Sequence, residues 1–186
     1  MVGSFISCSG EWHLTDVEPG PLPRSTLRLT GVFVLVVVAG LVIGWIVSRG
    51  SSAIAEVGEP APGFTVELID GGEFTLSEAR GRPVIVNLWA SWCAPCREEI
   101  PDISAFATAN PDVTVVGVAV QDPENSAREF AATIGATYPL ALGTTEFEDA
   151  YPHLGLPATY IIDQDGTVIE VINGIVDDAI LTEALT

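Results

Sequence analysis

The chain has 186 residues and a formal charge of −18, with 25 acidic residues against seven arginines and no lysine. So strong an acid excess excludes a nucleic-acid-binding protein, which would need a basic surface. The apolar fraction of 48% excludes a disordered acidic chain. Three cysteines are too few for a small domain held together by disulfides.

The charged and apolar residues are unevenly distributed. Residues 1–55 carry no net charge, whereas residues 56–186 hold 22 acids and four arginines. Residues 29–48 contain no charged side chain and are flanked by Arg28 and Arg49. A helix of about 20 residues spans the roughly 30 Å hydrocarbon core of a bilayer. We therefore predict one transmembrane helix at 29–48, in contact with the lipid bilayer, rather than a buried core helix.

The arginines around this span predict its orientation. Arg24 and Arg28 precede the span and Arg49 follows it, which places the N-terminus in the cytoplasm and the acidic part outside the plasma membrane. The alternative is a signal peptide cleaved after Ala55. The length of the apolar run favours an uncleaved anchor, and in either case the acidic domain is exported.

The remaining sequence divides into three parts. Residues 1–28 are expected to form a short cytoplasmic tail that contains Cys8 as an unpaired thiol. Residues 49–63 are expected to be a linker, because glycine, serine and proline are frequent there. Residues 64–186 are expected to form one folded domain.

Hydrophobic periodicity predicts the elements of this domain in order. Strands are expected at 64–69, 73–76, 83–89, 113–120, 159–162 and 167–172. Helices are expected at 93–109, 125–134, 144–151 and 176–185. Tight turns at 70–72 and 163–166 should join the two hairpins. Strands that alternate with helices and then end in a hairpin predict an α/β fold with a mixed sheet covered on both faces.

The segment from Trp92 to Cys96 carries the chemistry, because it places two cysteines at the start of a helix directly after a buried strand. Cysteines three residues apart at such a position lie close enough to form a disulfide. The backbone N–H groups and the positive end of the helix dipole favour a thiolate at Cys93. We therefore predict that Cys93 is the nucleophile and Cys96 the resolving thiol.

The cysteine pair has two other interpretations, a zinc site and a purely structural disulfide. Zinc needs four ligands, and the domain offers only His153 in addition to the pair. A purely structural disulfide would not need the strand, turn and helix around it. We therefore expect no metal and no cofactor apart from a redox-active Cys93–Cys96 disulfide.

Three segments resemble those of one protein family: 57–64, 87–96 and 155–163. The sequence resembles the thioredoxin-fold thiol–disulfide oxidoreductases of cell redox homeostasis, most of all their membrane-anchored, extracytoplasmic TlpA/ResA-like branch. This resemblance covers nearly all of residues 57–186 and implies a thioredoxin-like domain behind one transmembrane helix.

The resemblance also implies roles for residues near the cysteines. Pro157 would be a cis proline packed against the disulfide, and Leu156 would present backbone groups to an extended client segment. Trp92 would form part of the wall of the site. His153, by contrast, is expected to be a solvated loop residue.

A general base is harder to assign. Cytoplasmic thioredoxins bury an aspartate where this chain has Asn87, and the anchored branch instead has a glutamate at the position of Glu99. Because Glu99 lies one helical turn after Cys96, it could take the proton of that thiol. The alternative is that Glu99 is only an acid favoured near a helix N-terminus, as Glu98 is.

The resulting functional prediction is an enzyme that reduces protein disulfides. The resemblance implies apocytochrome c as a client, during cytochrome c biogenesis, and a membrane thiol transporter as electron donor. Two alternatives remain open. One is a peroxidase of the peroxiredoxin type, although Ala90 occupies the position where such enzymes have a threonine. The other is a non-catalytic binding domain.

Overall fold

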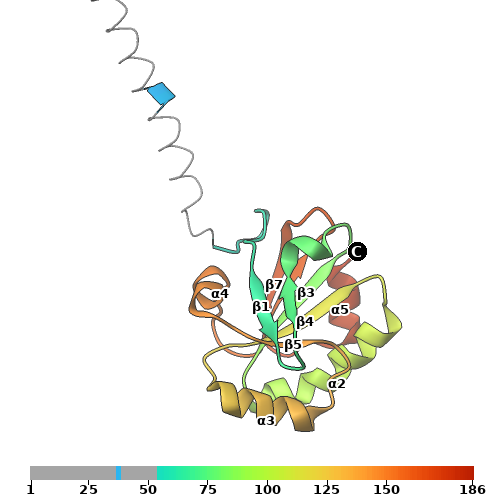
Figure 1. Ribbon diagram of the computed structural model, residues 1–186. Coiled ribbons are helices and arrows are strands. Elements are labelled where there is room, and N and C mark those ends of the chain that lie inside the picture. Colours follow the sequence, from blue (N-terminus) through green and yellow to red (C-terminus); the bar gives the residue numbers. More distant parts are fainter. Residues whose placement is uncertain (1–36, 39–53) are drawn as a thin grey trace, which may run out of the picture. The chain divides into compact units, whose positions relative to one another are not determined.

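A computed structural model describes residues 37–38 and 54–186, and its folded domain is shown in Figure 1. The predicted tail at 1–28, with Cys8, lies outside the described residues. So does the predicted transmembrane helix at 29–48, apart from its residues 37–38. Within the described part of the chain, no helix is both long and apolar enough to cross a bilayer.

A seven-stranded mixed sheet forms the centre of the domain, in the order β2-β1-β5-β4-β3-β6-β7 (Figure 1). Strands β3, β4 and β5 are parallel, and the strands to either side run antiparallel to their neighbours. The bounds are β1 Thr65–Leu68, β2 Glu73–Thr75, β3 Val84–Trp89, β4 Thr114–Ala119, β5 Leu140–Leu142, β6 Ala158–Ile162 and β7 Val168–Asn173. The sheet confirms the predicted fold class.

Four α-helices and one short 3-10 helix flank the sheet. They are η1 Leu76–Ala79, α2 Ala94–Ala109, α3 Glu124–Ile134, α4 Thr145–Ala150 and α5 Asp178–Ala184. Phe147 of α4 belongs to one buried cluster, while side chains of α2, α3 and α5 belong to a second. Val84 and Val86 of β3 belong to the first cluster, and Ile85 between them belongs to the second. Successive side chains of a strand point to opposite faces of the sheet, so the two clusters lie on opposite faces.

The first hairpin forms for the reason that the sequence suggested. Gly71 and Gly72 adopt φ values of 99° and 84°, which glycine tolerates better than any other residue. The Leu68 N–H donates to the Gly72 carbonyl at 3.0 Å and closes the turn. The predicted strands on either side are confirmed, each slightly shorter than expected.

Two elements were not predicted. Strand β5 has only three residues, which is too short to show a period in the sequence. It nevertheless lies between β1 and β4 and completes the sheet. The 3-10 helix η1 begins at Leu76, which is the last residue of the strand predicted at 73–76. The observed strand β2 therefore ends one residue earlier, at Thr75.

The leading segment, residues 54–63, is packed against the domain rather than forming a free linker. The N–H groups of Ala55 and Gly58 donate at 2.8 Å to the carbonyls of Ala150 and Val168, and the Ala61 N–H donates to the carbonyl of Gly166 at 2.8 Å. Both alanines are buried. Of the linker predicted at 49–63, the part from residue 55 onward is therefore held to the domain by backbone hydrogen bonds, which sequence periodicity does not reveal.

Candidate active site

The two cysteines of the motif form a disulfide at the N-terminus of α2. Cys93 is the N-cap residue, and the S–S distance to Cys96 is 1.97 Å. The Cys96 N–H donates to Cys93 Sγ at 3.2 Å. Cys93 is 4% exposed, whereas Cys96 is fully buried. Cys93 is therefore slightly more exposed than Cys96, and a helix N-terminus would favour a thiolate at Cys93.

The loop that precedes β6 contains a cis peptide bond between Leu156 and Pro157. Pro157 is buried, and its carbonyl accepts a hydrogen bond from the Gly174 N–H at 2.9 Å. Half-buried Leu156 packs against the apolar cluster that contains both cysteines. The cis proline expected from the resemblance is thus present, in a loop that packs against the cluster around the disulfide.

Glu99 is fully buried one turn after Cys96. Its Oε1 accepts a hydrogen bond from Asn87 Nδ2 at 2.7 Å, and its Oε2 accepts one from the Val176 N–H at 3.1 Å. Burial raises the pKa of Glu99 to about 7, although both hydrogen bonds oppose the shift. The carboxyl group therefore loses its proton at a higher pH than that of an exposed acid in a helix.

The two tryptophans differ in their surroundings. Trp89 ends β3, is fully buried and stacks on Phe130 with 5.1 Å between ring centroids. Trp92 is 60% exposed, and its Nε1 donates to the Gln121 carbonyl at 3.1 Å. Trp92 therefore offers an apolar ring directly before Cys93, while Trp89 packs in the core.

Gln121 and Asp122, which follow β4, were missed by the sequence analysis. The Asp122 carboxylate accepts hydrogen bonds from the Ser91 N–H at 2.5 Å and from Ser91 Oγ at 2.8 Å. Gln121 Nε2 lies 3.4 Å from His153 Nε2. His153 is half-buried, so it is more enclosed than the solvated side chain that the sequence predicted. Polar residues at the carboxyl end of a parallel strand were the signal that could have pointed to this pair.

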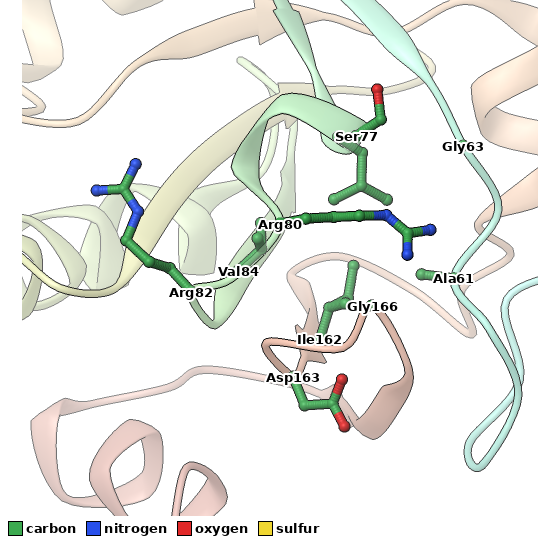
Figure 2. Close-up of a pocket in the computed structure, with 10 residues that line it drawn as sticks. Ala61, Gly63, Ser77, Arg80, Arg82, Val84, Ile162, Asp163 and Gly166 are labelled. Carbon is green, nitrogen blue, oxygen red and sulfur yellow. The ribbon is translucent and has the colours of Figure 1, made fainter.

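A small pocket lies elsewhere on the domain. It is lined by Val84 at the start of β3 and Ile162 at the end of β6, so it lies at the opposite end of the sheet from the cysteines. Its volume of about 50 Å³ is too small for a peptide segment. Figure 2 shows Arg80 lying across it toward Ala61. Among the described residues, no group of three or more His, Cys, Asp or Glu side chains is arranged to hold a metal ion.

A disulfide at the start of a helix, beside a loop with a cis proline in a mixed sheet, defines the thioredoxin-like class of fold. The chain belongs to the AhpC/TSA family, which it matches over residues 57–171. Its curated relatives and solved structural neighbours identify the activity more closely.

Two relatives share most of their length with this chain. Thiol-disulfide oxidoreductase ResA of Bacillus subtilis (strain 168) is 30% identical over 161 residues, covering 85% of this chain and 89% of that protein. The protein of the same name from Geobacillus kaustophilus (strain HTA426) is 32% identical over 154 residues, covering 81% of this chain and 88% of that one.

The solved structures agree with these relatives. A thiol:disulfide interchange protein of the thioredoxin family from Chlorobium tepidum TLS is 32% identical, with a TM-score of 0.63, and covers 72% of this chain and 97% of that one. The protein is therefore an enzyme of the thiol–disulfide oxidoreductase class with a Cys93–Cys96 pair, and such enzymes act on disulfide-containing client proteins.

Proposed function

We propose that this protein is a membrane-anchored, extracytoplasmic reductase of protein disulfides. The observation that carries the proposal is the Cys93–Cys96 pair at a helix N-terminus, with the cis Leu156–Pro157 bond in a loop that packs against the same cluster. Cys93 is the nucleophile because it is the more exposed cysteine and caps the helix.

Reduction of a client proceeds in two exchange steps. The Cys93 thiolate attacks one sulfur of the client disulfide, forms a mixed disulfide and releases the other client sulfur as a thiolate. The Cys96 thiolate then attacks Cys93 Sγ and releases the second client sulfur. The client gains two electrons, and the enzyme is left with the Cys93–Cys96 disulfide.

Glu99 is proposed as the base that accepts the proton of Cys96 before the second step. A base is most effective when its pKa lies near the working pH, and burial raises the pKa of Glu99 to about 7. Glu99 follows Cys96 by one helical turn, and Asn87 and the Val176 backbone hold its two oxygens. These contacts favour a defined role over that of an ordinary helix acid.

The client is proposed to bind as an extended segment across the cysteines. Leu156 would offer its backbone groups to that segment, as in the addition of a strand to a sheet. The exposed ring of Trp92 would cover an apolar part of the client. Pro157, which is buried, would keep the loop in position.

The location and electron supply are also part of the proposal. The uncharged run at 29–48 would anchor the chain in the plasma membrane with the acidic domain outside. A membrane thiol transporter would return electrons to Cys93 and Cys96. Apocytochrome c is the proposed client, and the acid excess of residues 56–186 would favour a basic partner of this kind.

A peroxidase is a weaker proposal for this site. Ala90 is fully buried and carries no hydroxyl group that could orient a peroxide beside Cys93. Its carbonyl accepts the Cys93 N–H at 3.1 Å, so its contact with Cys93 is structural.

The experiment is insulin-disulfide reduction by the purified full-length chain, compared with Cys93→Ser and Cys96→Ser. We expect Cys93→Ser to be inactive and Cys96→Ser to accumulate a mixed disulfide with the client, because the first step remains and the second is lost. A Cys93→Ser protein that retains the wild-type rate would contradict the proposal.

A further inference from the structure

Gln121 has an unusual backbone conformation beside the candidate active site. Its φ is 51°, and it is the one non-glycine residue with positive φ in the described part of the chain. It follows the carboxyl end of β4, which pairs in parallel with the β3 strand that leads to the cysteines. Strained residues of this kind cluster at functional sites, and long unbranched side chains are uncommon in this conformation.

Gln121 joins three other segments through its backbone and its side chain. Its carbonyl accepts the indole N–H of Trp92 at 3.1 Å, and its own N–H donates to Glu148 Oε1 at 2.9 Å. Its side-chain amide Nε2 lies 3.4 Å from His153 Nε2. Gln121 thus contacts the cysteine loop, helix α4 and the loop that contains His153.

The two loops lead to the disulfide and to the cis proline. Trp92 directly precedes Cys93, and the neighbouring Asp122 holds Ser91 through two hydrogen bonds. His153 lies in the loop between α4 and β6 that contains Pro157, and the next N–H in that loop, from Leu154, donates to Asn173 Oδ1 at 3.1 Å. The contact between Gln121 and His153 therefore links the cysteine loop to the cis-proline loop.

We propose that Gln121 is a positioning residue that sets the spacing between these two loops, and through it the binding of an extended polypeptide client. The inference rests on the proposed function, because it assumes that a client segment lies between Trp92 and Leu156. Gln121 donates no hydrogen bond to either cysteine and accepts none from them, and it acts through Trp92 and His153. Its loss should weaken client binding without changing the chemistry at Cys93.

The substitution Gln121→Gly separates this role from a merely structural one. Glycine accepts the positive φ without strain and keeps the two backbone hydrogen bonds, but it removes the amide that reaches His153. We therefore expect a melting temperature no lower than that of the wild type. A matched control is Gln164→Gly, in the exposed turn at the opposite end of the sheet.

The measurements are KM and kcat for insulin-disulfide reduction by the full-length chain, together with the rate at which iodoacetamide alkylates reduced Cys93. We expect Gln121→Gly to raise KM about fivefold, the effect of one lost hydrogen bond, with the alkylation rate unchanged. His153→Ala should raise KM to a similar extent, and the double variant should show no further increase, because both changes remove one contact.

The outcomes separate the two proposals. An unchanged KM in Gln121→Gly and His153→Ala, with an active wild type, overturns the positioning role alone. A slower alkylation of reduced Cys93 in Gln121→Gly than in the wild type also overturns it, because Gln121 would then act on the cysteine chemistry. A wild type that alkylates at Cys93 but reduces no insulin contradicts the proposed function, and the positioning role with it.

Discussion

The buried carboxylate of Glu99 accepts a hydrogen bond from Asn87 Nδ2 at 2.7 Å, in the layer between α2 and β3. Strand β3 thus carries the uncharged amide of Asn87, and helix α2 carries the ionisable carboxyl group of Glu99. The pair keeps one titratable group buried near Cys96 without placing a second charge beside it. Three predictions follow from this arrangement.

The first prediction concerns stability and pH. Burial raises the pKa of Glu99 from 4.5 to about 7, so the folded state holds this proton more tightly than the unfolded state. Glu99 should therefore add to the free energy of unfolding at low pH. This contribution should fall as the pH rises from 4.5 to about 7, by at most about 1.4 kcal/mol per pH unit.

Glu99→Gln should remove this contribution. Urea denaturation of the oxidised wild type and of Glu99→Gln, at several pH values between the two pKa values, measures it. The unfolding free energy of the wild type should fall relative to that of Glu99→Gln as the pH rises. A difference that does not change with pH would show that Glu99 keeps an ordinary pKa in the fold.

The second prediction concerns the resolving step. In Glu99→Gln no base is available to Cys96, and we expect release of a client from the mixed disulfide to slow by about 100-fold near neutral pH. Alkylation of Cys93 should change little. Stopped-flow measurement of the two steps checks this, with Glu98→Gln as the matched control, because Glu98 is an exposed acid of the same helix turn. Equal effects of the two variants would remove Glu99 from the mechanism.

The third prediction concerns Asn87. Asn87→Asp would place two carboxyl groups within hydrogen-bond distance in a buried site, and they could not both ionise without strong repulsion. We expect the unfolding free energy to fall by about 3 kcal/mol at pH 8, and by less at pH 5, where the groups share protons. The similarly sized but uncharged Asn87→Leu removes only the hydrogen bond that lowers the pKa of Glu99, so its loss should increase with pH less steeply. Parallel pH profiles for the two variants would contradict the account.

The fourth prediction tests the packing of the sheet. A Cβ at Gly143 would lie 2.5 Å from the Ala119 carbonyl oxygen, whereas a Cβ at Gly63 would meet nothing within 4 Å. Gly143→Ala should therefore destabilise the protein by about 1–3 kcal/mol, the usual range for overpacking. Gly63→Ala should have little effect. Thermal unfolding of both variants measures this, and equal melting temperatures would show that the backbone after β5 yields easily.

Much of the fold could be predicted because its main signals are local. The continuous apolar runs that became β3 and β4, and the two glycines of the first hairpin, are visible within a few residues of sequence. Strand β5 was missed because three residues show no period, and its place in the sheet depends on β1 and β4. The docked leading segment was missed because its hydrogen bonds are formed by the backbone.

The candidate site divides in the same way. The spacing of Cys93 and Cys96 and the loop of Pro157 are evident from the sequence, whereas the surroundings of Glu99 are not. Glu98 and Glu99 are the same residue type at neighbouring positions, and only the fold shows that Glu99 is the buried one. The partners of Glu99 lie 12 and 77 residues away in sequence. Gln121 was missed for a similar reason, since its partners Trp92, Glu148 and His153 lie 27 to 32 residues away in sequence.

The reduction potential of the Cys93–Cys96 disulfide tests the central claim, reduction of client disulfides, most directly. Equilibration of the purified protein with defined ratios of reduced and oxidised dithiothreitol measures it. The account predicts a value closer to the roughly −270 mV of thioredoxin than to the roughly −120 mV of DsbA. A potential near the DsbA value would identify an oxidant of client thiols and contradict the proposed direction of electron flow.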